Sequence, residues 1–487
     1  MSSALVRKLA RRMDAQAPAL STLDAYYSGN QPLSFLHPEI QANVRQRVRN
    51  LAINWPRIIV GSVEERLDVE GFRLGSDEVA DHEMWRVWQA NGLDEWSQMG
   101  HVDAMVHGRA FVSVWANEDD PGTPKISFES ARQVQASYRA GTRDLDAVLK
   151  VWRDDGVQHA WLYLPDRIEQ WATDVRPDMI QADVEYQRDG ADIDNPLDTP
   201  PFVPLVNRAR LMDLNGESEL SDVLPMADAV NKLATDMMVS SEYHAMPRRW
   251  ITGMQLPAQG PSRTRVQEEV KAEWSEAFPG KPWMAGKDVT FGQFPEAQLT
   301  NFIDAIKMLT TQIAAIAGLP PHYLGVNTDN PASADAIRSA ESSLVKKAER
   351  KQRAFGGSYE RVMRLAAQVR DGKPDPGLDG LETIWRDPST PTPAQKADAA
   401  VKLTQGPTPI ITRNQAREDL GYSQEQIARM SAEEQRAADL AATADVRARV
   451  ALATELMSTQ GLSQAAAFAA AGLIVAANQI STDGNTP

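Results

Sequence analysis

Two long amphipathic helices stand out in the pattern of apolar and polar residues. Apolar residues recur every three or four positions in 217–243 and again in 296–317, which predicts a helix with one apolar face in each segment. At about 1.5 Å per residue, each helix would be roughly 35–40 Å long. The apolar residues expected to pack along the two helices include Leu224, Leu233, Met237, Ile303, Ile306 and Ile313.

A compact module is predicted between these two helices. Met246-Pro247 ends the first helix, and strand-like residues follow at 249–253. An amphipathic pattern at 262–277 predicts a short helix, and 288–294 resembles a second strand. The pattern therefore places a strand–helix–strand module at the end of two helical legs.

A sheet is predicted in the first half of the chain. Between residues 108 and 206 the period changes to that of strands, and turn sequences such as Asp154-Asp155-Gly156 separate the short apolar runs. The candidate strands are 110–115, 125–128, 147–152, 159–164, 167–171 and 202–206. This pattern predicts a mostly antiparallel sheet and, with the helices, a helix-rich α+β fold. The polar stretch 188–201 is expected to be an exposed loop.

Helices are predicted on the N-terminal side of this sheet, after a short arm. Residues 1–30 begin with a basic, amphipathic stretch and are interpreted as a mobile or partner-ordered arm. Helical periods follow at 40–53 and 81–107. The apolar stripe of the second helix is expected to pack in the core, and it consists of Trp85, Trp88, Leu93, Trp96, Met99, Val102 and Val106.

A third long helix and a helical C-terminal region complete the pattern. Pro320-Pro321 ends the second long helix, and after a polar loop 333–369 predicts a helix that Gly356-Gly357 should weaken or kink. After a last strand at 383–386 the remaining patterns are helical, at 394–403, 413–420, 423–430, 432–457 and 463–478. Ser431, with Glu at the third helical position, is expected to cap the helix at 432–457.

Composition narrows the class of protein. A chain of 487 residues can form two to four domains, and the lack of cysteine excludes disulfides and thiolate metal sites and fits a reducing cytoplasm. The net charge of −15 disfavours a surface that grips nucleic acid, because phosphate binding needs Lys and Arg. The most apolar run, 465–477, is too short to span a bilayer, so no membrane anchor is expected.

Enzyme motifs are incomplete wherever the sequence approaches them. Residues 280–288 have five residues between two glycines where a phosphate loop has four. Arg86 replaces the second His of a zinc-protease helix that would begin at His82. No catalytic, cofactor-binding or metal-binding residue is therefore expected. His101 and His107 are expected to be core or surface histidines, since six residues place them on different faces of a helix.

Three separated segments resemble a single protein family, in the same order. The segment from Tyr26-Tyr27-Ser28-Gly29 to Asn54-Trp55-Pro56 is similar to the start of that family. Residues 225–250 (PMADAVNKLATDMMVSSEYHAMPRRW) resemble its first stem helix, and 318–341, with Gly-Leu-Pro-Pro-His-Tyr-Leu-Gly, resemble its tunnel-loop segment. The family is that of tailed-bacteriophage portal proteins of the long-tailed (siphovirus) type.

The resemblance implies a portal-type fold for nearly the whole chain. The implied parts are an N-terminal arm (1–30), a wing (31–216 and 333–392), a two-helix stem (217–247 and 296–318), a strand–helix–strand clip (248–295), a tunnel loop (319–332), an all-α crown (393–479) and a disordered tail (480–487). The residues implied to line the channel are Asn327, Thr328, Asp329 and Asn330. The clip residues implied to dock a partner are Arg248, Arg249, Trp250, Arg263 and Arg265.

The resemblance also implies a function. Portal proteins form a ring, usually a dodecamer, at one capsid vertex, through which double-stranded DNA is packaged and ejected without sequence-specific binding. The implied partners are the terminase large subunit, which is a separate ATPase, a head–tail adaptor, the major capsid protein and a scaffold if present. The implied location is the virion, after assembly in the host bacterial cytoplasm, with no enzyme activity or cofactor. The channel loop 327–330 has no Lys or Arg, which suits a moving polyanion.

Two other classes of function remain open at this stage. The chain could be another head–tail connector or a scaffold-type assembly protein, although most adaptors are smaller and scaffolds are simpler. It could also be a hydrolase with facing Asp and Glu carboxylates, which no motif supports. Size in solution separates a ring from an enzyme. The basic cluster at 346–353 is expected to be a solvated face or to pair with a neighbouring subunit.

Overall fold

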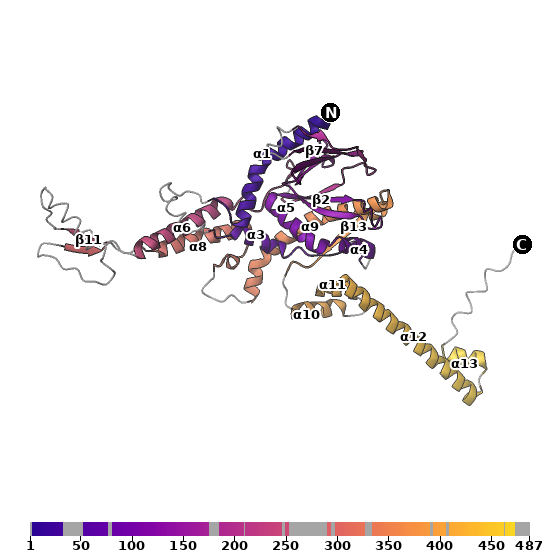
Figure 1. The fold of residues 1–487 in the computed structure, drawn as a ribbon. Coiled ribbons are helices and arrows are strands. Elements are labelled where there is room, and N and C mark those ends of the chain that lie inside the picture. Colours follow the sequence, from indigo (N-terminus) through magenta and orange to yellow (C-terminus); the bar gives the residue numbers. More distant parts are fainter. Residues whose placement is uncertain are drawn as a thin grey trace, which may run out of the picture.

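The protein is a helix-rich α+β body from which a helical hairpin and a run of C-terminal helices project (Figure 1). The computed structural model describes residues 2–32, 52–75, 80–174, 185–208, 210–245, 249–252, 290–293, 298–326, 334–389, 393–405, 409–461 and 463–472. The predicted α+β class is confirmed. Within the described residues, no helix combines the length and apolarity needed to cross a lipid bilayer.

The first helix, α1 (Ser2–Ser28), packs against a sheet, so the interpretation of residues 1–30 as a mobile or partner-ordered arm was wrong. Val6, Leu9 and Met13 are buried against the sheet, and Tyr26 near its other end donates a hydrogen bond of 2.6 Å to Asp228. Figure 1 shows α1 running from the sheet to the helical hairpin. The basic residues of α1 point away from this apolar face, which explains the amphipathic pattern.

The largest sheet is antiparallel and lies under the first half of α1. Its order is β4-β5-β6-β7-β8, with β9 also paired to β7. The strands are β4 (Val134–Tyr138), β5 (Leu145–Asp154), β6 (Val157–Tyr163), β7 (Arg167–Asp174), β8 (Gln187–Arg188) and β9 (Ile193–Asp194). The three strands predicted at 147–152, 159–164 and 167–171 are confirmed. The expected exposed loop 188–201 instead carries β9 and the buried residues Asn195 and Leu197.

A second, three-stranded sheet lies between the first sheet and the central helices. Its order is β10 (Phe202–Val206), β2 (Arg109–Trp115) and β3 (Lys125–Ser130), all antiparallel. Phe111 and Phe202 pack towards the larger sheet, whereas Val112 and Val114 belong to the main core with α5 (Leu93–His107) and α9 (Ala334–Asp371). Two further strands, β1 (Val69–Leu74) and β13 (Leu381–Trp385), form a separate antiparallel pair.

The helix predicted at 81–107 is two helices. Asp81 caps α4 (His82–Ala90) by accepting hydrogen bonds from the amides of Glu83 and Met84, and a break at Asn91-Gly92 precedes α5. The break changes the phase of the apolar stripe. Trp88 is therefore buried in the core, as predicted, whereas Trp96 is 51% exposed and Met99 is exposed as well. The helix α3 (Trp55–Glu64) was not predicted, and the predicted helix at 40–53 lies mostly outside the described residues.

The long helices of the second half agree with the pattern in outline. They are α6 (Leu224–Ala245), α8 (Thr300–Ala317) and α9, with the short turns η2 (Pro321–Leu324) and η3 (Pro376–Gly380). The helix α9 is continuous through Gly356-Gly357, so the glycines do not end it. A Cβ on Gly356 would lie 3.0 Å from Trp385 Nε1, so this glycine allows β13 to approach the helix closely.

The C-terminal region is helical, as predicted. It contains α10 (Pro393–Thr404), α11 (Arg413–Leu420), α12 (Gln424–Gln460) and α13 (Gln464–Ala470). The two helices predicted at 423–430 and 432–457 are one helix, and the prediction of a cap at Ser431 was wrong. Ser423 forms the capping box with Gln426, and Ser431 instead donates a hydrogen bond to Asn414.

Candidate assembly hairpin and its root

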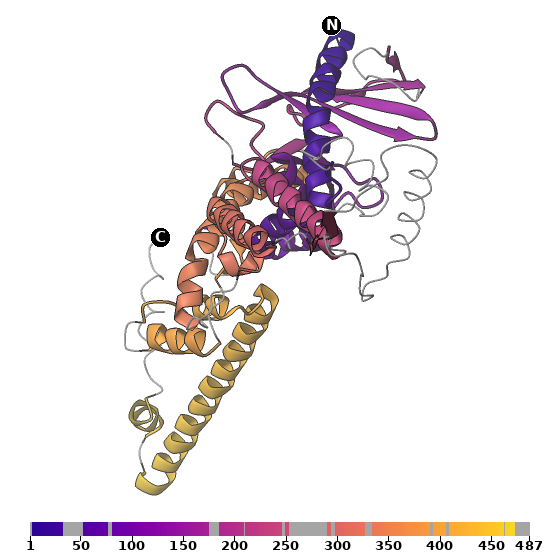
Figure 2. The same cartoon turned by 90° about the vertical axis from the view of Figure 1, so that its left-hand side faces the viewer.

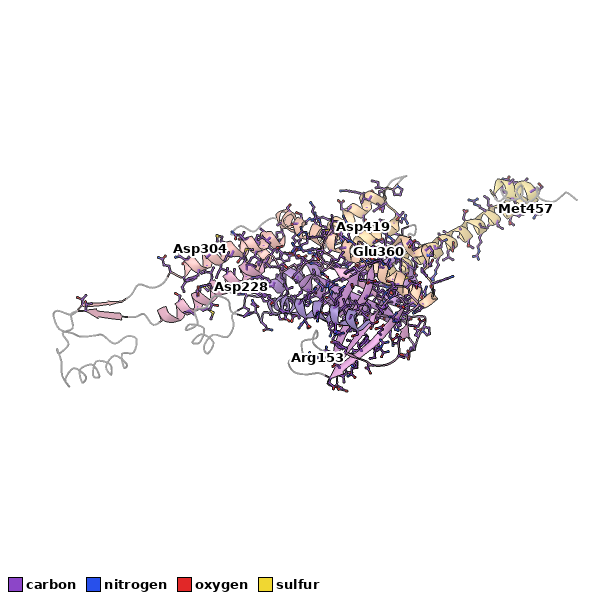
Figure 3. The ribbon with its side chains drawn as sticks, turned by 90° about the horizontal axis from the view of Figure 1, so that it is seen from above. Arg153, Asp228, Asp304, Glu360, Asp419 and Met457 are labelled. Carbon is purple, nitrogen blue, oxygen red and sulfur yellow. The ribbon has the colours of Figure 1, made fainter. Side chains whose placement is uncertain are left out.

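The hairpin formed by α6 and α8 is the main projection of the body. The chain leaves the body along α6 and returns along α8, and the two helices lie side by side, with Asp228 on α6 and Asp304 on α8 (Figure 3). Pro225 occupies the first turn of α6, where its missing N–H breaks no intrahelical hydrogen bond. Near the body, Val230 and Ala234 of α6 and Ala314 of α8 are buried.

The residues predicted to pack along the hairpin differ in burial within the single chain. Ile313 is 1% exposed, whereas Ile303 is 48% exposed. Leu224 and Ile306 are half-buried against the main core. Leu233 and Met237 are half-buried as well. The single chain therefore covers the root of the hairpin and leaves its outer part incompletely covered.

Helix α8 presents apolar side chains on two opposite flanks. At 100° per residue, Ile303 and Ile316 lie on opposite sides of the line through Ile306 and Ile313. Met308 lies farther round on the flank of Ile316 and is 57% exposed. Exposed Ile and Met on both sides of one helix indicate contacts that the single chain does not make.

Two lysines of α9 bind the hairpin at its root, which consists of the segment just before α6 and the C-terminal end of α8. Lys347 Nζ lies 2.6 Å from Glu219 Oε2, just before α6, and donates a hydrogen bond of 3.0 Å to the carbonyl oxygen of Ala317, at the end of α8. Lys351 binds the other oxygen of Glu219 and the side chain of Asn207, after β10. We call Glu219, Lys347 and Lys351 the root clamp.

The root clamp is a buried ion-pair network. Burial alone would raise the pKa of Glu219, but the ammonium groups of Lys347 and Lys351 outweigh it and hold that pKa at about 2. Burial lowers the pKa of Lys351, although Glu219 opposes that shift. Two residues of the basic cluster at 346–353 thus form ion pairs within the chain. The helix predicted at 217–243 begins only at Leu224, so Glu219 lies before it.

A second polar network lies where the predicted channel loop begins. Arg66, after α3, donates a hydrogen bond of 3.0 Å to the hydroxyl of Tyr323 in η2, and Tyr323 donates one of 3.2 Å to Glu341 of α9. Arg66 Nη2 also lies 3.6 Å from Glu341 Oε2. The predicted channel residues Asn327, Thr328, Asp329 and Asn330 lie outside the described residues.

The predicted clip is described only at its two strands. β11 (Arg249–Thr252) and β12 (Thr290–Gln293) pair antiparallel, with Trp250 opposite Gly292, so the two predicted strands are confirmed. Arg249 and Trp250 belong to β11. Arg248, Arg263 and Arg265, and the helix predicted at 262–277, lie outside the described residues. The five predicted docking residues therefore stay a prediction.

The histidines of α5 are structural. His101 is fully buried, stacks on Phe355 at 5.3 Å and lies 2.7 Å from the Tyr359 hydroxyl, and burial lowers its pKa to about 3, so it is neutral. His107 is buried beside Asp103. The interpretation of His101 as a core histidine is confirmed. In the part of the chain that the structure describes, no group of three or more His, Cys, Asp or Glu is placed to hold a metal ion.

Two relatives with more than 30% identity are portal proteins of mycobacteriophages. The chain is 39% identical over 385 residues to the portal protein of Mycobacterium phage D29, a match that covers 76% of each protein. It is 36% identical over 417 residues to the portal protein of Mycobacterium phage L5, covering 83% of this chain and 82% of that protein. Among solved structures, the neck of a native gene transfer agent particle computed with C12 symmetry matches 80% of this chain and 94% of its own, with 12% identity and a TM-score of 0.44.

The family comparison covers most of the sequence. The model of the family described as "Phage portal protein, SPP1 Gp6-like" matches residues 7–440, from α1 into α12. That range includes the hairpin, the root clamp and both strands of the predicted clip. The chain therefore belongs to the phage portal protein family.

Proposed function

We propose that twelve copies of this chain form a ring at one vertex of a phage capsid, around an axial channel for double-stranded DNA. In this proposal the hairpin of α6 and α8 is the stem, residues 248–295 are the clip, and the tunnel loop 319–332 faces the DNA through Asn327–Asn330. The wing comprises 31–216 and 333–392, and 393–479 is the crown. Membership of the portal family supports the role.

The two apolar flanks of α8 are the observation that carries the ring proposal. A cyclic ring contacts every copy through two different surfaces, one towards each neighbour. Ile303 on one flank and Met308 and Ile316 on the other supply two such surfaces on one helix. Burying an apolar side chain of this size contributes about 1.5–3 kcal/mol, so several such contacts in every copy favour assembly.

The partners follow from the same proposal. The terminase large subunit would supply ATP hydrolysis and dock, with the head–tail adaptor, at the clip through Arg248, Arg249, Trp250, Arg263 and Arg265. The major capsid protein and a scaffold would contact the outer parts of the ring. The channel would pass DNA without gripping it, because a lip without Lys or Arg makes no strong phosphate contact. The assembled protein would be in the virion, after assembly in the host cytoplasm.

Size and shape of the purified full chain test this function. Light scattering after gel filtration is expected to give about twelve times the 53.7 kDa of one chain. Negative-stain class averages are expected to show a ring with a central hole. A particle with the mass of a single chain throughout the micromolar range, with no ring in the images, would refute the proposal.

A further inference from the structure

The outer side of the first half of α1 is basic. Between Ser2 and Met13 every charged residue is Lys or Arg, and all of these residues are exposed. They lie within about 8 Å along the helix axis. At 100° per residue they occupy the side opposite the one that α1 buries against the large sheet. We call this side the cationic face, and it consists of Arg7, Lys8, Arg11 and Arg12.

The charges of the cationic face are not neutralised by the rest of the described chain. Farther along α1, Asp24 pairs with Arg132 at 3.1 Å, whereas no cation of the face forms an ion pair with a described residue. Arg7 donates only long hydrogen bonds, of 3.4 and 3.5 Å, to oxygens one turn earlier. Two acids lie at the margin of the face: Asp14 is half-buried, and Glu185 lines a small hollow beside Arg7. The face therefore keeps a positive excess towards solvent.

The position of this face separates it from the hairpin. The first half of α1 covers the large sheet, and only the other end of the helix reaches α6, through the hydrogen bond from Tyr26 to Asp228. Figure 2 shows the N-terminus of α1 beside the strands, at the opposite end of the view from α12 and α13. The net charge of −15 describes the whole chain, so it does not exclude a local surface that attracts anions.

The other residues of the cationic face favour a phosphate backbone over a protein as its partner. Ala4 and Ala15 lie on the centre line of the face, and both are exposed. The core of a protein–protein interface is normally rich in aromatic residues and Met, which this face lacks. Contact with a phosphate backbone needs only Lys or Arg and a close approach, which the small alanines allow. A membrane is disfavoured, because the apolar side of α1 is already buried and cannot insert.

We infer that the cationic face of α1 binds the phosphate backbone of double-stranded DNA, outside the channel and without reading the sequence. Each strand of the duplex presents a charge about every 3.4 Å, so four cations spread over about 8 Å can each reach a phosphate. The choice of duplex DNA as the polyanion rests on the proposed function. The inference adds to that function a second surface, which holds DNA, whereas the tunnel loop is proposed to let DNA slide.

The salt dependence of DNA binding by the purified full chain tests this inference. The probe is a relaxed, closed-circular plasmid, which has no end that could enter a channel. The logarithm of the binding constant is expected to fall with the logarithm of the salt concentration, with a slope of about −3.6 for each face that engages four phosphates. The variant Arg7→Gln/Arg11→Gln is expected to halve the slope. Replacement of all four residues by Gln is expected to weaken binding roughly tenfold or more at 100 mM salt.

Two control variants separate the cationic face from net charge and from folding. Lys346→Gln/Arg350→Gln removes two exposed cations of α9 and changes the net charge by the same amount as the double variant of α1. It is expected to leave the slope unchanged. Arg7→Lys/Arg11→Lys keeps both charges and is expected to keep the slope of the wild type. An equal effect of the α9 variant would overturn the inference, because net charge alone would then explain the loss.

The remaining outcomes distinguish this inference from the proposed function. Normal rings by electron microscopy, together with full plasmid binding by the variant that lacks all four cations, would overturn the inference and leave the ring in place. Poly-L-glutamate serves as a competitor that represents an acidic protein. Binding of poly-L-glutamate but not of the plasmid would assign the face to such a protein and overturn the inference as well. Absence of rings would refute the proposed function, while plasmid binding by single chains could still be measured.

Discussion

Removing the carboxylate of the root clamp should loosen both ends of the hairpin. Glu219→Gln keeps the shape of the side chain but leaves the buried ammonium group of Lys351 and the half-buried one of Lys347 without this anion. The pKa of Glu219 is about 2 in the folded chain against an ordinary value of 4.5, and this difference corresponds to about 3 kcal/mol at neutral pH. Breaking a buried ion pair by removing one partner costs a similar amount, about 3–5 kcal/mol.

Hydrogen exchange measures this effect at the clamp. In Glu219→Gln, the amides of Leu220 and Leu319, beside the two ends of the hairpin root, are expected to exchange up to about a hundredfold faster than in the wild type, since 1.4 kcal/mol corresponds to a factor of ten. Lys346 is an exposed lysine of α9, the helix that carries Lys347 and Lys351. The variant Lys346→Met is therefore the control and should leave these exchange rates unchanged.

The pH dependence has a definite sign. Because the folded pKa of Glu219 lies below the ordinary value, its stabilisation is complete above about pH 5 and is lost as the pH falls through 4.5 towards 2. The difference in melting temperature between wild type and Glu219→Gln should therefore be largest near neutral pH and shrink in acid. Equal exchange rates in the two proteins, or a difference in melting temperature that is as large at pH 3 as at neutral pH, would refute the reasoning.

Three further predictions concern separate parts of the chain. Gly216→Ala should lower the melting temperature, because φ is +71° and the new Cβ would overlap the backbone oxygens of Asn207 and Gly108. Gly141→Ala is the control, since Gly141 has a similar φ of +77° but no atom near the new Cβ. Equal losses of melting temperature in the two variants would contradict the clash. Ile306→Asp should abolish ring formation, so normal rings by electron microscopy would count against the packing of α8. Asp329→Lys should slow DNA packaging through added phosphate attraction, and an unchanged packaging rate and genome length would remove the tunnel loop from the proposal.

Local sequence patterns predicted an element correctly where one face of that element is more buried than the other. β6 alternates buried and half-buried residues along its length, and the period of two in the sequence predicted it. β1 (VEGFRL) has Glu, Gly and Arg among its six residues and was missed. It is a strand because β13 pairs with it, and the register Phe72 to Thr383 joins residues about three hundred positions apart, which no local pattern indicates.

The sequence could not predict the root clamp either, because its residues are far apart in the chain. The sequence shows Lys347 and Lys351 four residues apart, hence on one face of a helix, but the carboxylate that binds both is more than a hundred positions away in the chain. The merging of two predicted helices into α12 has a local cause instead. Ser431 resembles a cap, yet a serine inside a helix costs little, and Ser423 already supplies the N-terminal cap.

The hairpin and α9 should move as one unit. Lys347 contacts Glu219, shortly before α6, and the last carbonyl of α8, so tilting either helix against α9 must separate Lys347 from one of these partners. In the proposed ring, the exposed flanks of α8 are the surfaces that neighbouring copies would touch. α9 also packs on β2, β10 and β13 and binds η2 through Glu341. A displacement of the hairpin would therefore reach η2 through α9.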